Sequence, residues 1–224
     1  YKAAHIRPLW MDLEAVPHIS FASERWRECM SQYLAEFCQK FADTPQGRHI
    51  MGIQLASGTY GEYHNWAFTK HEPDTSEPML RFFRSYLRDK YGSDKALRKA
   101  WNDPDVSIET VPMPMMERLE TTEGIFRNPE CERRYSDYYE ALNKAVTRSI
   151  LHSASVVKAN WPRPVLTGFF YGYYFSIFGR QATGGHIFEE DILNSADIDF
   201  VCAPQAYNKN SRKAGGPGLS RGLI

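Results

Sequence analysis

The chain has 224 residues and carries 27 Lys and Arg against 27 Asp and Glu, so its formal net charge is zero. Nucleic acids and anionic membranes select a basic excess or a basic stripe, and none is visible, so the charge pattern argues against both as partners. Hydrophobic residues make up 42% of the chain and charged residues 24%, as expected of a globular protein with one large domain or two small ones.

Aromatic residues are unusually frequent, at 14% of the chain, and many of them lie beside glycine. Such rings can bind the flat C–H faces of sugars, or they can simply fill a core, and composition leaves both possibilities open. The cysteines form no CxxC pair and have no metal-like spacing, so we expect buried free thiols. They are Cys29, Cys38, Cys131 and Cys202.

The first predicted helix covers residues 23–42, where apolar residues recur at spacings of three and four and Ser23 can cap the first turn. A short apolar run at 50–55 follows and predicts a strand buried on both faces. This strand leads into "SGTYGEYHNW", a glycine-rich turn that presents one acid, Glu62, among rings.

Two helices are predicted next, at 76–91 and 93–101, with Gly92 between them. Residues 102–129 contain four prolines and no sustained period, so we expect a long surface excursion. The longest helix is predicted at 132–159.

A strand at 165–170, a glycine-aromatic loop, a short helix at 187–194 and a last strand at 198–203 complete the pattern. Strands separated by helices indicate parallel βα units, in an open doubly wound sheet or in a closed barrel. In both, ligand sites gather at the carboxyl ends of the strands. Here those ends follow Leu55, Phe170 and Ala203, and each carries glycine, rings and polar groups.

Neither GxGxxG nor GxxxxGK[ST] follows a strand, which argues against nucleotide binding and favours the barrel. A (β/α)8 TIM barrel needs eight units and about 250 residues, whereas only three strands are legible here. We therefore expect one partial barrel domain over residues 1–224. No cofactor is expected.

Glu62 is the candidate catalytic residue. A carboxyl packed against rings has its charged form disfavoured, so it can hold a proton near neutral pH, as protonation of a glycosidic oxygen requires. The alternative is a solvated loop glutamate, and His64 could equally be a loop histidine bonded to backbone. The candidate substrate-binding residues are Tyr60, Tyr63, His64, Trp66, Tyr171, Tyr173, Gln205 and Tyr207.

Two acidic clusters are set aside, and no metal site is expected. Residues 189–191 (Glu-Glu-Asp) point to different sides of a helix, so a solvated first turn is the better interpretation. His71, Glu72 and Asp74 lack a further ligand at metal spacing. No Ser lies in a GxSxG elbow.

Several segments, in order, carry a family resemblance: "ISFASERWRECM", "GIQLASGTYGEYHNW", "FFRSYLRDKYGSDKALRKAWNDPDVS" and "SADIDFVCAPQAY" with its "GGPG" loop. The chain resembles glycoside hydrolases of the retaining (β/α)8-barrel clan, most of all relatives of the family 42 β-galactosidases. The resemblance implies that 50–55, 165–170 and 198–203 are barrel strands four to six, and that Glu62 is the general acid/base. The nucleophile, a second Glu, belongs to strand seven and is expected beyond Ile224, so the chain looks like a fragment.

One departure from the family bears on the substrate. Family 42 enzymes have an Asn directly before the acid, where it contacts the sugar 2-hydroxyl, and this chain has Gly61. The stretch between the strand and Glu62 is also longer. The resemblance therefore implies a divergent branch rather than a secured β-galactosidase.

Three functions stay open. The first is a retaining hydrolase of terminal β-linked sugars, and the second is a barrel that binds carbohydrate without cleaving it. The third is a small α/β domain with another role. A partial barrel would expose strand edges, so we expect flanking domains or a second copy as partners. The chain opens at Tyr1, and the sequence leaves the compartment open.

Overall fold

The computed structural model describes residues 19–58, 60–65, 74–114, 127–173 and 184–202. These residues form a mixed α/β structure whose helices and strands agree with the predicted ones to within two residues at each described end. The elements in chain order are α1 (Glu24–Phe41), a 3-10 helix (Gly47–His49), β1 (Gly52–Leu55), α2 (Glu77–Tyr91), α3 (Asp94–Trp101), α4 (Arg133–Asn160), β2 (Leu166–Phe170), α6 (Glu189–Leu193) and β3 (Phe200–Cys202).

The three strands form one parallel sheet in the order β1-β2-β3. Gly52 pairs with Leu166, and Gly168 pairs with Phe200. Each strand lies beside the next one in sequence, with helices in each connection, so the predicted parallel βα units are confirmed. As a result the carboxyl ends of all three strands lie at one edge of the sheet, where ligand sites of such folds gather.

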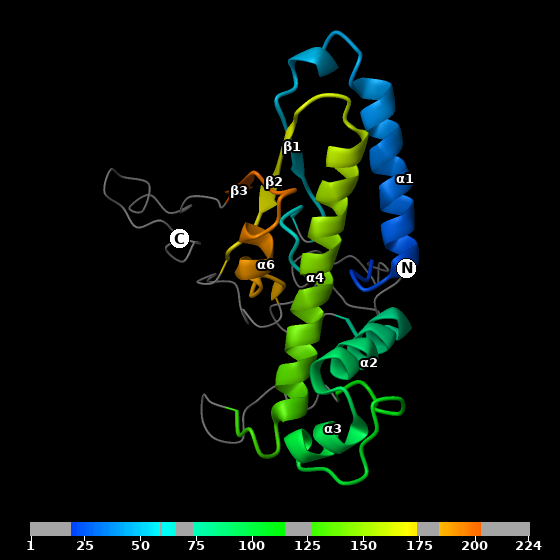
Figure 1. Ribbon diagram of the computed structural model, residues 1–224, viewed down its shortest axis with the longest axis vertical. Coiled ribbons are helices and arrows are strands. Elements are labelled where there is room, and N and C mark those ends of the chain that lie inside the picture. The colour runs from blue at the N-terminus through cyan, green and yellow to red at the C-terminus, as the bar shows by residue number, and fades with distance from the viewer. Residues whose placement is uncertain (1–18, 59, 66–73, 115–126, 174–183, 203–224) are drawn as a thin grey trace, which may run out of the picture.

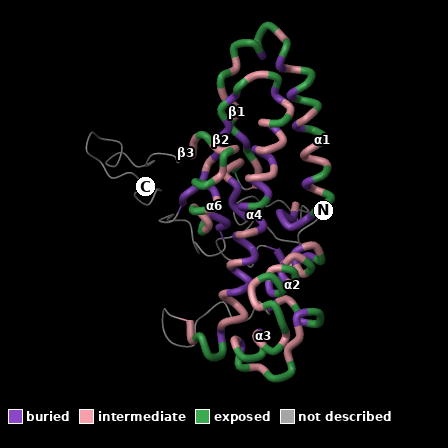
Figure 2. Tube along the Cα trace, in the orientation of Figure 1, coloured by how far each residue is buried: buried purple, intermediate pink, exposed green. Residues whose placement is uncertain are grey.

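The helix α4 is the central element and runs along most of the molecule (Figure 1). α1 lies against its C-terminal half, and α2 with α3 lies against its N-terminal half. The apolar residues that recur at three and four along α4 are buried, as predicted, except Tyr135, which is partly buried. Figure 2 shows buried residues along this helix. The buried members of the stripe are Tyr138, Tyr139, Leu142, Val146, Ile150, Ala154 and Val157.

Serine caps start three of the helices. The hydroxyls of Ser23, Ser76 and Ser93 accept hydrogen bonds from backbone N–H groups three residues later, at 3.2, 3.4 and 3.3 Å. Each cap satisfies a donor that has no partner inside its helix. The helix starts predicted from these serines are confirmed.

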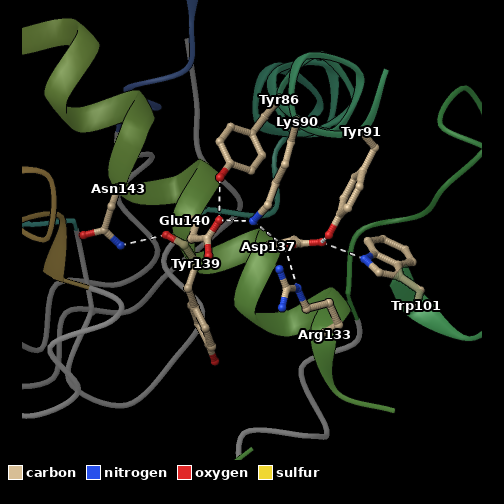
Figure 3. Close-up of polar contacts among 9 residues, drawn as sticks. All are labelled: Tyr86, Lys90, Tyr91, Trp101, Arg133, Asp137, Tyr139, Glu140 and Asn143. Carbon is tan, nitrogen blue, oxygen red and sulfur yellow. Dashed lines mark hydrogen bonds and ion pairs between the residues drawn. The ribbon is translucent and has the colours of Figure 1, made fainter. Parts of the chain in front are cut away.

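A buried carboxylate joins α2 and α3 to α4 (Figure 3). Asp137 of α4 is fully buried and accepts hydrogen bonds from Lys90 Nζ (2.9 Å), the Tyr91 hydroxyl (2.7 Å) and Trp101 Nε1 (2.6 Å). A buried charge of this kind is stable only when it is paired and hydrogen-bonded, and here both conditions hold. This network fixes the helical end of the molecule that lies away from the sheet.

The exposure of the cysteines tests the expectation of buried free thiols. Cys38 is buried, whereas Cys131 is exposed and Cys29 and Cys202 are partly exposed, so the expectation of buried thiols is wrong for Cys131. Nothing in the sequence marked the exposure of Cys131. Among the described helices, none has the length and apolar character needed to cross a membrane.

Candidate active site

The turn after β1 has an unusual backbone. Four of its residues lie in the left-handed region, with φ between 59° and 77°, namely Gly58, Tyr60, Gly61 and Tyr63. Non-glycine residues rarely adopt this conformation, and such strain clusters at functional sites. The Tyr63 N–H closes the turn by donating to the Ser57 carbonyl across 2.7 Å. This hydrogen bond closes the turn that carries Glu62 at the end of the sheet.

Glu62 projects from this turn and is largely shielded from water, with 16% of its side chain exposed. Burial raises the pKa of the Glu62 carboxyl above its usual value, and a hydrogen bond with Tyr173 acts in the opposite direction. His64 Nε2 lies 3.8 Å from Glu62 Oε2. Glu62 is therefore not a solvated loop glutamate, and its environment favours the protonated acid.

Tyr60 is the exposed ring of the site, with 54% of its surface accessible. The pKa of its hydroxyl is raised, first by partial burial and then by the negative charge of Glu62. An exposed ring beside an acid is suited to pack on an apolar sugar face, since rings offer a flat contact area at low entropic cost.

Tyr63 and Tyr171 lie beneath the site, in the core. Tyr63 packs on Phe21 and against the edge of Phe169, with ring centroids 6.0 Å apart in each pair. Tyr171 is fully buried, and its hydroxyl accepts a hydrogen bond from the Phe188 N–H (3.1 Å). Tyr63 was a candidate sugar contact as a ring beside Glu62, and Tyr171 as a ring of the loop after β2, but both are buried and pack beneath the site.

His64 is buried and its Nδ1 lies 3.3 Å from the Gly184 carbonyl, so the backbone-bonded alternative describes it well. The Asn65 N–H also donates to Gly184 (3.1 Å), which ties the turn after β1 to the segment before α6. Burial lowers the pKa of His64 to about 4, so its imidazole is neutral near neutral pH.

His186 belongs to the same cluster, and the sequence gave no sign of it. Its ring stacks on His64 with centroids 4.3 Å apart and an angle of 14°, and Tyr173 meets His64 edge-on at 4.7 Å. His186 follows two glycines in an apparently ordinary loop, and no spacing links it to His64. Only the pairing of two loops across the sheet end brings these rings together.

The remaining candidates are accounted for as follows. Trp66, Gln205 and Tyr207 lie outside the described residues, as do His71 and Glu72. Asp74 is buried and accepts hydrogen bonds from Ser20 and Ser76, which is a structural role. In the part of the chain that the structure describes, no three His, Cys, Asp or Glu side chains are grouped as a metal site would need.

An open cleft of about 1070 Å³ lies between α2, α4 and α6, away from Glu62. The cations on its walls are paired: Lys90 with Asp137 and Glu140, Lys144 with Asp191, and Arg148 with Glu24. The Asp191 pair also agrees with the solvated first turn expected for residues 189–191. The candidate site is therefore the turn that carries Glu62, at the end of the sheet.

Comparison with solved structures finds a similar fold in several β-galactosidases and in a β-amylase. A β-galactosidase from Halorubrum lacusprofundi matches with a TM-score of 0.61 and 17% identity over 96% of this chain, and one from Bacillus circulans with 0.57 and 18% over 90%. The catalytic domain of a β-amylase from Paenibacillus polymyxa matches with 0.64 and 18% over 92%. The chain spans 29%, 27% and 54% of these proteins' lengths, respectively.

At these identities the likeness establishes a shared fold. The chain matches no protein-family model and no curated protein. Function must therefore be argued from the site itself.

Proposed function

We propose that this chain is part of a retaining glycoside hydrolase in which Glu62 is the general acid/base. The observation that carries the proposal is the environment of Glu62: a largely shielded carboxyl with a raised pKa, held at the carboxyl end of a parallel strand. A carboxyl in such surroundings stays protonated at a pH where ordinary glutamates are ionised. The fold that this chain shares with β-galactosidases and a β-amylase supports the proposal.

In the proposed reaction Glu62 protonates the glycosidic oxygen as the bond to the sugar breaks, and later removes a proton from the attacking water. A retaining mechanism also needs a carboxylate nucleophile about 5 Å from the acid. That residue is proposed to lie outside this chain, on the seventh strand of the barrel. Glu62 therefore supplies one half of the catalytic pair.

The substrate proposed is a terminal β-linked sugar. The exposed ring of Tyr60 would pack on an apolar sugar face, and the hydroxyl of Tyr173 would hold the acid in place. Trp66, Gln205 and Tyr207 stay proposed contacts. Because Gly61 has no side chain where the resembled family has an Asn, the proposal extends to β-linked sugars as a class rather than to galactosides alone.

The barrel is part of the proposal. β1, β2 and β3 are consecutive parallel strands, which suits strands four to six of a (β/α)8 barrel. Within the described residues β1 and β3 are edge strands, and Met51 and Leu166 near the sheet are exposed. Flanking segments of the protein or a second copy would cover these edges.

The test is Glu62→Gln in the complete gene product. With substrates that have poor leaving groups, the variant is expected to lose about 10²–10⁴-fold in kcat/KM, because proton donation is lost. Activated aryl glycosides, which need little protonation, are expected to lose far less. Glu189→Gln on α6 is the matched control and should leave turnover intact. Equal losses for good and poor leaving groups would contradict the acid role.

Carbohydrate binding without cleavage is the second candidate, and the exposed Tyr60 ring favours it, because stacking on a sugar needs no acid. Under this alternative, the wild-type protein binds the sugar but does not hydrolyse it. Tyr60→Ala then weakens binding, whereas Glu62→Gln leaves it unchanged. Calorimetric titration with and without detectable turnover separates the two functions.

A further inference from the structure

His186 lies between the two loops that form the candidate site. The Tyr173 N–H, after β2, donates to His186 Nδ1 in a long hydrogen bond of 3.5 Å. The carbonyls of Glu62 and Tyr63, in the turn after β1, also lie close enough to His186 to act on its pKa. This one imidazole therefore lies between the backbone of Tyr173 and the turn that carries Glu62, where it stacks on His64.

The ring of His186 is held on both faces. It stacks on His64 at 4.3 Å and on Tyr171 at 4.5 Å, and it is buried. Its own segment is fixed to α4, because the Ile187 N–H donates to Asn143 Oδ1 (3.3 Å). His186 is thus anchored to the central helix and packed against the turn that carries Glu62.

We infer that His186 is a positioning residue for Glu62, because its neutral imidazole holds the Glu62 turn and the Tyr173 loop in one arrangement. The inference rests on the proposed function only for its consequence in catalysis. Loss of the His186 ring would let the turn after β1 and the loop after β2 move apart. Glu62 would then gain water, and the burial that favours its protonated form would weaken.

The arrangement requires both histidines to be neutral. Nδ1 of His186 accepts a hydrogen bond, so it carries no proton, and the ring proton belongs on Nε2. Burial lowers the pKa of His186 well below its usual value, and the nearby imidazole of His64 lowers it further. Among the described residues, the titratable groups that face the pair are Glu62, Tyr171 and Tyr173.

The decisive measurement is the pKa of the Glu62 carboxyl, obtained by NMR titration of the complete protein labelled with ¹³C at glutamate Cδ. Glu62→Gln assigns the signal. His186→Phe keeps a flat ring but cannot accept the Tyr173 N–H, and it is expected to lower the Glu62 pKa by about half a unit or more. His186→Asn restores an acceptor near the Nδ1 position and is expected to recover part of that shift. The control is His152→Phe, at a partly buried histidine between α1 and α4 that bonds to Ser31.

The outcomes separate the inference from the proposed function. A folded His186→Phe protein with an unchanged Glu62 pKa would overturn the inference, whatever the activity. A shifted pKa supports it even if the wild-type protein hydrolyses no glycoside, in which case only the proposed function fails. If His186→Phe does not fold, the ¹⁵N shifts of His186 in the wild type decide: a neutral ring protonated at Nε2 supports the inference, and a charged or Nδ1-protonated ring at pH 6 overturns it.

Discussion

The indole Nε1 of Trp101 donates a hydrogen bond of 2.6 Å to the buried carboxylate of Asp137. Trp101 ends α3 and Asp137 lies in the first turns of α4, so this bond fastens the two helices. Lys90 of α2 reaches the same carboxylate and also pairs with Glu140 one turn later, where the Tyr86 hydroxyl donates as well (2.5 Å). Figure 3 shows these side chains converging between the helices.

Asp137→Asn should be strongly destabilising. The amide presents a donor to groups that are themselves donors, and it removes one of the two carboxylates that pair with Lys90. We expect a loss of about 3 kcal/mol in the free energy of unfolding, as for other broken buried ion pairs. Urea titration measures it. Asp103→Asn removes a half-exposed pair with Arg134 and should cost less than about 1 kcal/mol, so equal losses would contradict the account.

Gly168→Ala should disrupt the sheet. A Cβ at this position of β2 would lie 2.3 Å from the ring of Phe200 on β3, which is closer than atoms can approach. Gly52 on β1 is the matched control, because a Cβ there would meet its nearest atom at 3.3 Å. We expect Gly168→Ala to cost about 2 kcal/mol or more and Gly52→Ala less than about 1 kcal/mol. Thermal unfolding followed by circular dichroism compares the two, and a reversed order would show that Phe200 does not lie across Gly168.

The contribution of His64 to stability should fall as the pH drops from 6.5 to 4. The pKa of His64 is about 4 in the folded protein, whereas an unperturbed histidine, as in the unfolded chain, has a pKa of 6.5. Between these two values the unfolded chain binds a proton that the folded protein excludes. The free energy of unfolding therefore decreases with falling pH, by up to roughly 3 kcal/mol from His64 alone. Above pH 6.5 the imidazole is neutral in both states and the contribution is complete.

His64→Gln tests this pH dependence, since glutamine does not titrate. Urea midpoints at pH 7, 5.5 and 4 should decline less steeply in the variant than in the protein that keeps His64. Asp74, whose pKa is raised, remains in both proteins and cancels in the comparison. Because Glu62 lies 3.8 Å from His64, both proteins carry Glu62→Gln, so that the titration of Glu62 does not enter the comparison. Parallel pH profiles would show that His64 is accessible to protons in the folded state.

The sequence could predict the elements well, because the signals that define them are local. Ser76 and Gly92 bound α2, and apolar spacing along α4 identifies its buried stripe. Glu62 could be proposed because a lone acid in a glycine-rich turn after a strand is itself a local signal. The location of the candidate site at the carboxyl end of the sheet could be predicted because strands separated by helices indicate parallel pairing.

The features of the site that the sequence could not predict depend on contacts between loops. His186 joins the site only because the Gly184 carbonyl accepts the Asn65 N–H, a pairing that no spacing encodes. Tyr63 and Tyr171 looked like sugar contacts from their neighbours in sequence. Their backbone conformations turn the rings inward, and for Tyr63 this includes a positive φ that a tyrosine rarely adopts.

The most direct test of the central claim, that Glu62 is the acid/base, is rescue by azide. In the complete protein, Glu62→Ala leaves space beside the sugar, and azide can attack the glycosyl intermediate without help from a base. With an activated aryl β-glycoside, azide is expected to restore turnover and to yield the β-glycosyl azide, detected by NMR. Unchanged activity of Glu62→Ala toward substrates with poor leaving groups, or turnover that azide neither accelerates nor diverts to an azide product, would contradict the claim.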